Sequence, residues 1–85
     1  GLSQLRSLKH LDLGENQITA LPDDVGQLTQ LTTLELSVNG LTSLPSSLNG
    51  LSRLQFLDLS ANRFEQGLPE NLRLLGDRAD LEIEV

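Results

Sequence analysis

The sequence predicts a right-handed α/β solenoid, with a parallel β-sheet on its concave face and short helical or 3-10 turns on its convex face. Leu8, Leu31 and Leu54 follow one another at intervals of 23 residues, and each opens the pattern L-x-x-L-x-L-x-x-N-x-hydrophobic, followed by LP. Such self-similarity indicates a solenoid, because one unit cannot bury its apolar face alone. We expect a single domain over 1–85, a fragment of a longer protein, made of a partial unit 1–7, full units 8–30, 31–53 and 54–77, and a partial unit 78–85.

Each unit contains a short strand at its L-x-L segment. Alternation sends Leu11 and Leu13 to one face and Asp12 to the other. The strands must be parallel, because every unit returns the chain to the same starting point. The apolar side chains of one unit therefore stack on those of the next at strand spacing, about 4.8 Å.

One asparagine recurs where the chain turns away from each strand. Its side chain has both a donor and an acceptor, so a ladder of Asn16, Asn39 and Asn62 can satisfy turn backbone groups that would otherwise be buried without partners. We expect these side chains to point inward and to serve the structure.

The LP dipeptides at 21–22, 44–45 and 68–69 begin the return segment of each unit. Proline presets φ and needs no amide hydrogen, so it suits the start of a helical or 3-10 turn. Glycines at 26, 50 and 76 should keep these turns short, because glycine weakens or ends a helix.

The rear partial unit is aligned by matching Leu81 with Leu57. The third unit is one residue longer than the others, and the extra residue falls in the segment FEQGLP, where Gly67 suits a bulged connection. In this alignment Glu82 occupies the position of Asp58.

The composition narrows the classes of partner. The chain has 12 Asp+Glu against 6 Lys+Arg, a formal net charge of −6 and a pI near 4.4. This charge opposes binding to nucleic acid or to anionic membrane surfaces. There is no cysteine, no N-x-Ser/Thr acceptor and no apolar run long enough to span a bilayer, and GLSQLRS is neither a signal nor a transit peptide. Together these features favour a cytoplasmic setting.

The repeated pattern resembles the leucine-rich repeat family, in its 23-residue typical class, LxxLxLxxNxLxxLPxxLxxL. The resemblance covers essentially the whole chain, and similar repeats occur in intracellular Ras-suppressor, Roco and Scribble-like proteins and in related plant and bacterial proteins. It implies a solenoid that binds proteins, as signalling scaffolds do. Extracellular members usually add a phenylalanine late in each repeat and cysteine-rich caps, which this sequence lacks. That departure supports the intracellular interpretation.

Nothing in the sequence indicates catalysis, a metal site or a cofactor. His10, the only histidine, lies beside Asp12 on a strand face, but no G-x-S-x-G turn or oxyanion donors accompany them. The acids also lack the D-x-D-x-D-G spacing of a calcium loop. We therefore expect no enzyme activity, no catalytic residue, no metal and no cofactor.

The outward strand positions concentrate acidic side chains. The position between the two motif leucines holds Asp12, Glu35, Asp58 and Glu82, which predicts carboxylates about 4.8 Å apart. Like charges so close together cost stability. The whole outward surface counts seven acids against Arg63, the single base at its edge. The predicted partner-binding residues are His10, Asp12, Glu15, Thr33, Glu35, Val38, Phe56, Asp58, Arg63, Asp80 and Glu82.

The neighbouring column is expected to contain His10, Thr33, Phe56 and Asp80. Phe56 is an outward aromatic flanked by acids, a side-chain type typical of contact anchors. Aspartate between the two leucines is also common across the family that the sequence resembles, so the acidic column can reflect the scaffold as much as binding.

The resulting hypothesis is a non-catalytic protein-protein interaction scaffold that binds a basic peptide or protein surface on its acidic concave sheet. A first alternative is a structural, spacer or engineered repeat fragment, with end-to-end self-association through uncapped solenoid ends. A second is a substrate-recruiting module of a larger signalling enzyme.

Overall fold

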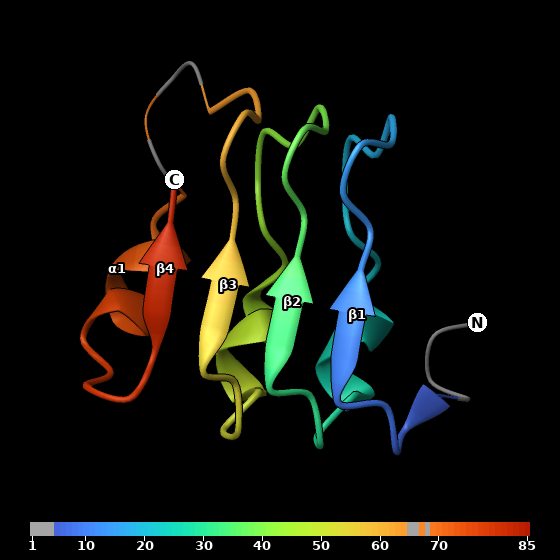
Figure 1. Ribbon diagram of the computed structural model, residues 1–85. Helices are drawn as coiled ribbons and strands as arrows, with labels where there is room; N and C mark the ends of the chain where they lie inside the picture. Colours follow the sequence, from blue (N-terminus) through green and yellow to red (C-terminus); the bar gives the residue numbers. More distant parts are fainter. Residues whose placement is uncertain (1–4, 65–66, 68) are drawn as a thin grey trace.

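The computed structural model describes residues 5–64, 67 and 69–85 of the chain. Four short strands form one parallel sheet in the order β1-β2-β3-β4, so that neighbours in sequence are also neighbours in the sheet (Figure 1). The strands are β1 (His10–Asp12), β2 (Thr33–Glu35), β3 (Phe56–Asp58) and β4 (Glu82–Glu84). The repeated unit therefore produces the predicted solenoid.

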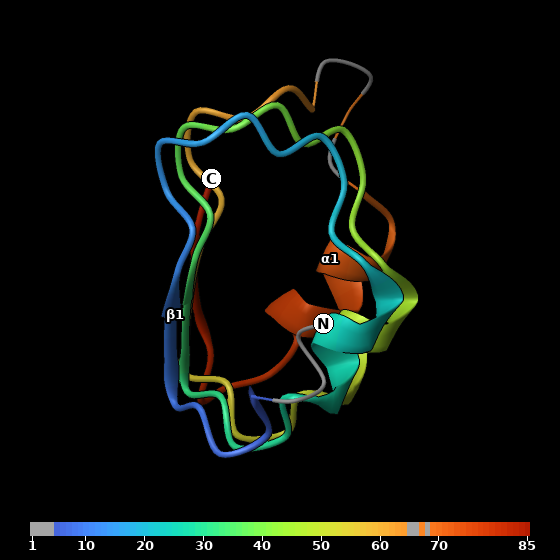
Figure 2. The ribbon, with the colours of Figure 1, turned by 90° about the vertical axis from the view of Figure 1, so that its right-hand side faces the viewer.

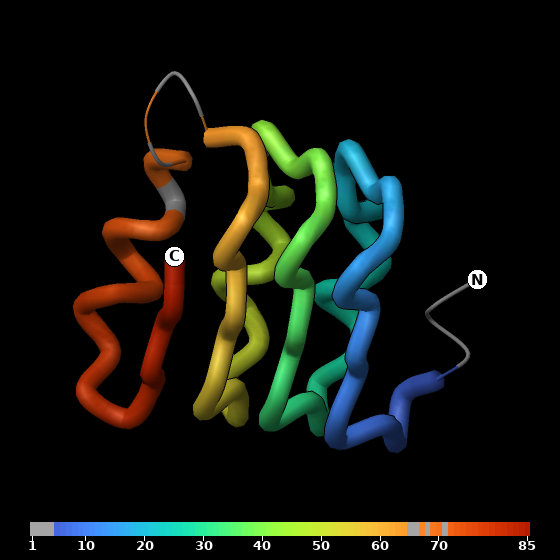
Figure 3. Tube along the Cα trace, turned by 45° about the horizontal axis from the view of Figure 1, so that its top comes forward, coloured from blue at the N-terminus to red at the C-terminus, as the bar shows by residue number. Residues whose placement is uncertain are grey.

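The return segments lie on the side of the coil opposite the sheet, as the view along the stack shows (Figure 2). The described segments between successive strands contain two 3-10 helices and one α-helix: η2 (Asp23–Gln27), η3 (Ser46–Gly50) and α1 (Asn71–Gly76). Successive turns of the chain stack in register, with the described N-terminal end beside β1 and the C-terminus at β4 (Figure 3). No helix in the described ranges has the length and apolar character needed to cross a membrane.

Proline positions explain where the 3-10 helices begin. Pro22 and Pro45 cap η2 and η3 from an extended conformation, with φ of −69° and −68°. Gly26 in η2 is required by packing, because a Cβ there would lie 2.6 Å from the Ser47 Cβ of the next unit. The prediction for the third LP dipeptide includes Leu68, which lies outside the described residues.

The core is a stack of leucines between the sheet and the return segments. Leu34, Leu36 and Leu41 of the second unit are completely buried, whereas Leu11 and Leu13 of the first are only half-buried. The difference follows from the stacking, because each unit covers the apolar face of its neighbour. The apolar surface at the β1 end is partly open, and end-to-end association stays a prediction.

The alignment of the fourth strand was wrong. Leu34 follows Leu11 by 23 residues and Leu57 follows Leu34 by 23, but Ile83, not Leu81, pairs with Leu57 and follows it by 26. The last return segment contains an α-helix of six residues where the earlier units have 3-10 helices of five. Leu81 instead precedes the strand as Leu54 does, and it is buried in the core.

Candidate functional site

Four carboxylates lie side by side on the face of the sheet that points away from the core. The pairing register joins Asp12 to Glu35, Glu35 to Asp58 and Asp58 to Glu84. The prediction that Glu82 completes this column was wrong by two positions, because the fourth strand is shifted. We call this surface the acidic sheet face, defined by Asp12, Glu35, Asp58 and Glu84.

The neighbouring column contains His10, Thr33, Phe56 and Glu82. Asp80 was predicted to complete it, but Asp80 lies in the turn before β4, where one carboxylate oxygen is 3.7 Å from Arg78 Nε. Phe56 is half-buried, less accessible than the sequence suggested, because residues of both neighbouring strands flank it. In the pairing register it lies between Thr33 of β2 and Glu82 of β4.

Two of the four carboxylates also stabilise their own turns. Asp12 Oδ1 accepts a hydrogen bond of 2.9 Å from the Gly14 amide, and Asp58 Oδ1 accepts bonds of 3.0 and 2.7 Å from the Ser60 amide and hydroxyl. This is a local aspartate-to-backbone bond of the kind that supports turns. This structural role of Asp12 and Asp58 was not predicted from the sequence. An aspartate followed two residues later by glycine or serine at the start of a turn is the pattern that would have indicated it. No such bond joins Glu35 to Ser37 in the part of the chain that the structure describes.

The central position of Glu35 raises the pKa of its carboxyl group above the ordinary value of 4.5. The negative charge of Asp12 is the largest cause, followed by partial desolvation, a hydrogen bond shared with Asp12 and the charge of Asp58. The positive charge that His10 can carry opposes the shift. The acidic sheet face therefore repels its own central charge.

Replacing Glu35 with glutamine should make the protein more stable at neutral pH. A raised pKa means that the folded protein retains a proton which the unfolded chain releases, so ionisation of Glu35 costs stability as pH rises from 4.5 through the folded pKa. The advantage of the variant should shrink as the pH falls from the folded pKa towards 4.5 and should be lost below 4.5, because the carboxyl is then protonated in both states. Urea denaturation between about pH 3.5 and 7 measures this difference. Glu70→Gln, on the opposite side of the coil, is the control, and an equal gain there would contradict the explanation.

The turns that follow β1, β2 and β3 each contain a residue with left-handed backbone geometry. Glu15, Val38 and Ala61 have φ of 59°, 57° and 56°. This conformation is costly for residues other than glycine, above all for β-branched valine. The amides of Glu15 and Val38 donate to Ser37 O and Ser60 O of the next unit, so the geometry extends the pairing beyond the strands. Glu15 and Val38 are exposed at the end of the sheet, beside the acidic sheet face.

The repeated asparagines bind backbone groups of two successive units. Asn39 Nδ2 donates to Leu13 O at 2.9 Å and Leu36 O at 3.0 Å, and Asn39 Oδ1 accepts from the Ile18 amide at 3.1 Å. Asn62 repeats this arrangement one unit later. Asn16 donates to Leu13 O and Gly14 O, as Asn39 donates to Leu36 O and Ser37 O, so the two side chains are oriented alike, but Asn16 is exposed and both of its bonds stay within its own turn. No earlier described unit lies beside it.

Arg63 lies apart from the acidic sheet face. It follows Asn62 in the turn after β3, its side chain is exposed, and its backbone amide donates to Leu41 O. Arg63 is one of the residues that line a hollow at the edge of the solenoid. Among the described residues, no group of three or more His, Asp or Glu side chains is arranged to hold a metal ion. The carboxylate column runs along the sheet and does not converge on one point.

The repeat geometry and the asparagine ladder agree with the comparison to known families. The sequence model described as leucine rich repeat matches residues 6–64. The chain belongs to the leucine-rich repeat family. No curated protein sequence showed significant similarity to it. Leucine-rich repeat domains are commonly protein-interaction modules and are typically non-catalytic.

A solved structure shows the same leucine-rich repeat fold. A leucine-rich repeat protein of Leptospira interrogans superimposes with a TM-score of 0.83 and is 36% identical over 99% of this chain. The match covers 21% of the Leptospira protein, so this chain spans about a fifth of that length. The similarity includes the repeat architecture and carries no information about a partner.

Proposed function

We propose that this leucine-rich repeat chain is a non-catalytic interaction scaffold, and that its acidic sheet face binds a basic segment of a partner protein. The observation that supports this function is the register of Asp12, Glu35, Asp58 and Glu84 on four adjacent strands. Directly opposed like charges destabilise a sheet. A cationic partner would remove that repulsion when it binds.

Within the acidic sheet face, Glu35 and Glu84 are the two carboxylates whose presence is best explained by partner binding. The local hydrogen bonds of Asp12 and Asp58 give those two residues a reason to be present without any partner. Glu35 lies between them and has a raised pKa because their charges oppose its ionisation. A basic side chain placed over Glu35 would face carboxylates from three adjacent strands. Phe56 lies next to Asp58 and offers part of its ring for apolar contact.

This geometry suits an extended segment that crosses the strands. Side chains of successive strands repeat at about 4.8 Å, and alternate side chains of an extended peptide repeat at roughly 6.6–6.8 Å. Two or three basic residues of one segment can therefore reach different carboxylates of the column. Complementary charge of this kind raises the association rate and weakens with salt.

A labelled peptide of about eight residues, with alternating arginine and glycine, tests the proposal by fluorescence anisotropy at about 50 and 300 mM NaCl. Glu35→Lys should weaken binding about tenfold at the lower salt concentration, because it places a positive charge at the centre of the column. Asp23→Lys is the matched control, since it makes the same charge change at an exposed position of η2 across the coil. Affinity lost equally in both variants would show binding by net charge alone and refute a role for the acidic sheet face.

A further inference from the structure

A hollow of about 550 Å³ lies at the edge of the solenoid, where the chain leaves strands β1 to β3. The position after each ladder asparagine supplies Gln17, Gly40 and Arg63, and the position two residues further along supplies Thr19 and Thr42. The asparagines of the first two turns complete the lining. We call this surface the Gly40 hollow, because a glycine lies between the longer side chains on the neighbouring turns.

Neither the backbone nor the packing requires glycine at position 40. Its φ lies outside the left-handed region, in contrast with Gly67 at 103°. A Cβ at Gly40 would lie 3.5 Å from Thr19 Cγ2 and 3.6 Å from Ile18 O, which is ordinary van der Waals contact. A side chain at this position would therefore fit and would occupy the space between Gln17 and Arg63. The effect of glycine here is to leave that space open.

The groups around this space are hydrogen-bonding and carry one positive charge. Arg63 contributes a guanidinium, Gln17 an amide, and Thr19 and Thr42 a hydroxyl each. No hydrogen bond joins any of these four side chains to another residue in the described ranges. Among the described residues that line the hollow there is no carboxylate, although the chain as a whole has a net charge of −6. The charge that these described residues carry is thus opposite in sign to that of the acidic sheet face.

The geometry points to the Gly40 hollow as a second binding site, which takes the carboxylate of an aspartate or glutamate side chain from a peptide. Guanidinium and carboxylate form paired hydrogen bonds, and Arg63 lines the hollow from the turn next to that of Gly40. Hydroxyl and amide groups can donate to the carboxylate or bind the adjacent peptide backbone. The site is separate from the acidic sheet face. Binding of a carboxylate in the hollow therefore does not depend on whether the acidic sheet face binds a basic segment.

Amide chemical shifts of the ¹⁵N-labelled chain test this site during titration with acetyl-Gly-Glu-Gly-amide, whose only carboxylate is in its side chain. We expect saturable shifts at residues of the hollow, and shifts at least about fivefold smaller with acetyl-Gly-Gln-Gly-amide at the same concentrations. Acetyl-Gly-Gly-Gly with a free C-terminus separates a side-chain carboxylate from a chain terminus. Equal or stronger binding of that peptide would overturn the assignment to an acidic side chain.

Two variants act on different parts of the site. Arg63→Gln removes the cation, and Gly40→Gln fills the space, where the first added atom makes only ordinary contacts. Each should weaken binding of the glutamate peptide at least about tenfold. Arg53→Gln is the matched control because it removes the same charge from an exposed position before β3, and it should leave the affinity within about twofold. An unchanged affinity in Gly40→Gln, or an equal loss in Arg53→Gln, would show that the peptide responds to surface charge only.

Discussion

Replacing Asn39 with alanine should lower the free energy of unfolding by about 2 kcal/mol, because the Ile18 amide loses its acceptor and Leu13 O and Leu36 O each lose one of two asparagine donors. The Asn39 amide donates to Leu13 O and Leu36 O, and its oxygen accepts from the Ile18 amide. Asn39 is 9% exposed, so water cannot easily replace these bonds. Urea denaturation followed by circular dichroism measures the loss.

Asn16→Ala is the matched control for this experiment. Asn16 occupies the same position of the preceding unit, but its side chain is exposed and binds only Leu13 O and Gly14 O of its own turn. Its replacement should cost less than about 1 kcal/mol, since solvent reaches the groups left behind. Equal losses in the two variants would mean that the side chain acts within its own turn and does not join successive units.

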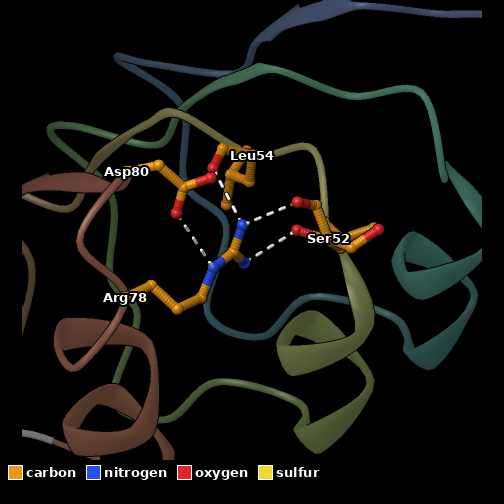
Figure 4. A network of polar contacts seen from close by, with 5 residues as sticks. Ser52, Leu54, Arg78 and Asp80 are labelled. Carbon is orange, nitrogen blue, oxygen red and sulfur yellow. Dashed lines mark hydrogen bonds and ion pairs between the residues drawn. The ribbon is translucent and has the colours of Figure 1, made fainter.

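Replacing Arg78 with alanine should cost about 2 kcal/mol, since hydrogen bonds from a charged group are stronger than neutral ones. The Arg78 guanidinium donates to Leu51 O at 2.8 Å, Ser52 O at 2.9 Å and Leu54 O at 3.1 Å, and so joins the last return segment to the one before it (Figure 4). The same side chain has 22% exposure and lies 3.7 Å from Asp80. Denaturant midpoints of the parent and the variant provide the measurement.

Arg78→Lys distinguishes the hydrogen bonds from the charge. A lysine ammonium keeps the charge but cannot match the planar group that reaches three carbonyls, so this variant should recover less than half of the loss. Arg53→Ala, at an exposed position, should change stability by no more than about 0.5 kcal/mol. Full recovery with lysine would show that the charge alone stabilises this corner.

Position 78 also shows where an arginine can take the place of a leucine. Leu81 N donates to Arg78 O, as Leu54 N donates to Leu51 O and Leu31 N to Leu28 O. Leu28 and Leu51 are completely buried, whereas Arg78 is partly exposed. At this position the last return segment therefore contacts the preceding one through hydrogen bonds from Arg78 to carbonyl groups, whereas Leu28 and Leu51 pack in the apolar core.

The parts of the fold that repeat could be predicted from the sequence. Leucine spacing sets which side chains face inward, and Leu34 and Leu57 are completely buried and paired as expected. The position of the fourth strand could not be predicted in the same way. An α-helix lengthens the last return segment, and only one residue separates Leu81 from Ile83 where two separate Leu54 from Leu57. A count of residues therefore placed Glu82 beside Asp58, where the structure places Glu84.

Some features of the candidate site could also be predicted from the sequence, and others could not. An acidic outward column followed from the alternation of the strands, and Asp12, Glu35 and Asp58 occupy it in the structure. The hydrogen bonds from the Asp12 and Asp58 carboxylates to their own turns were not predicted, because they depend on the backbone path after each strand. The space beside Gly40 also could not be predicted, since it depends on Gln17 and Arg63 lying on adjacent turns.

The sequence by itself determined the unit, its period and the faces of its strands, because alternation and repetition are local properties of the chain. Only the tertiary structure decided which residues of one unit lie beside which residues of the next. Stacking brings Asp12, Glu35, Asp58 and Glu84 together, raises the pKa of Glu35, and leaves the hollow between turns that are 23 residues apart in the chain. These are properties of contacts between units, and one insertion in a return segment is enough to change them.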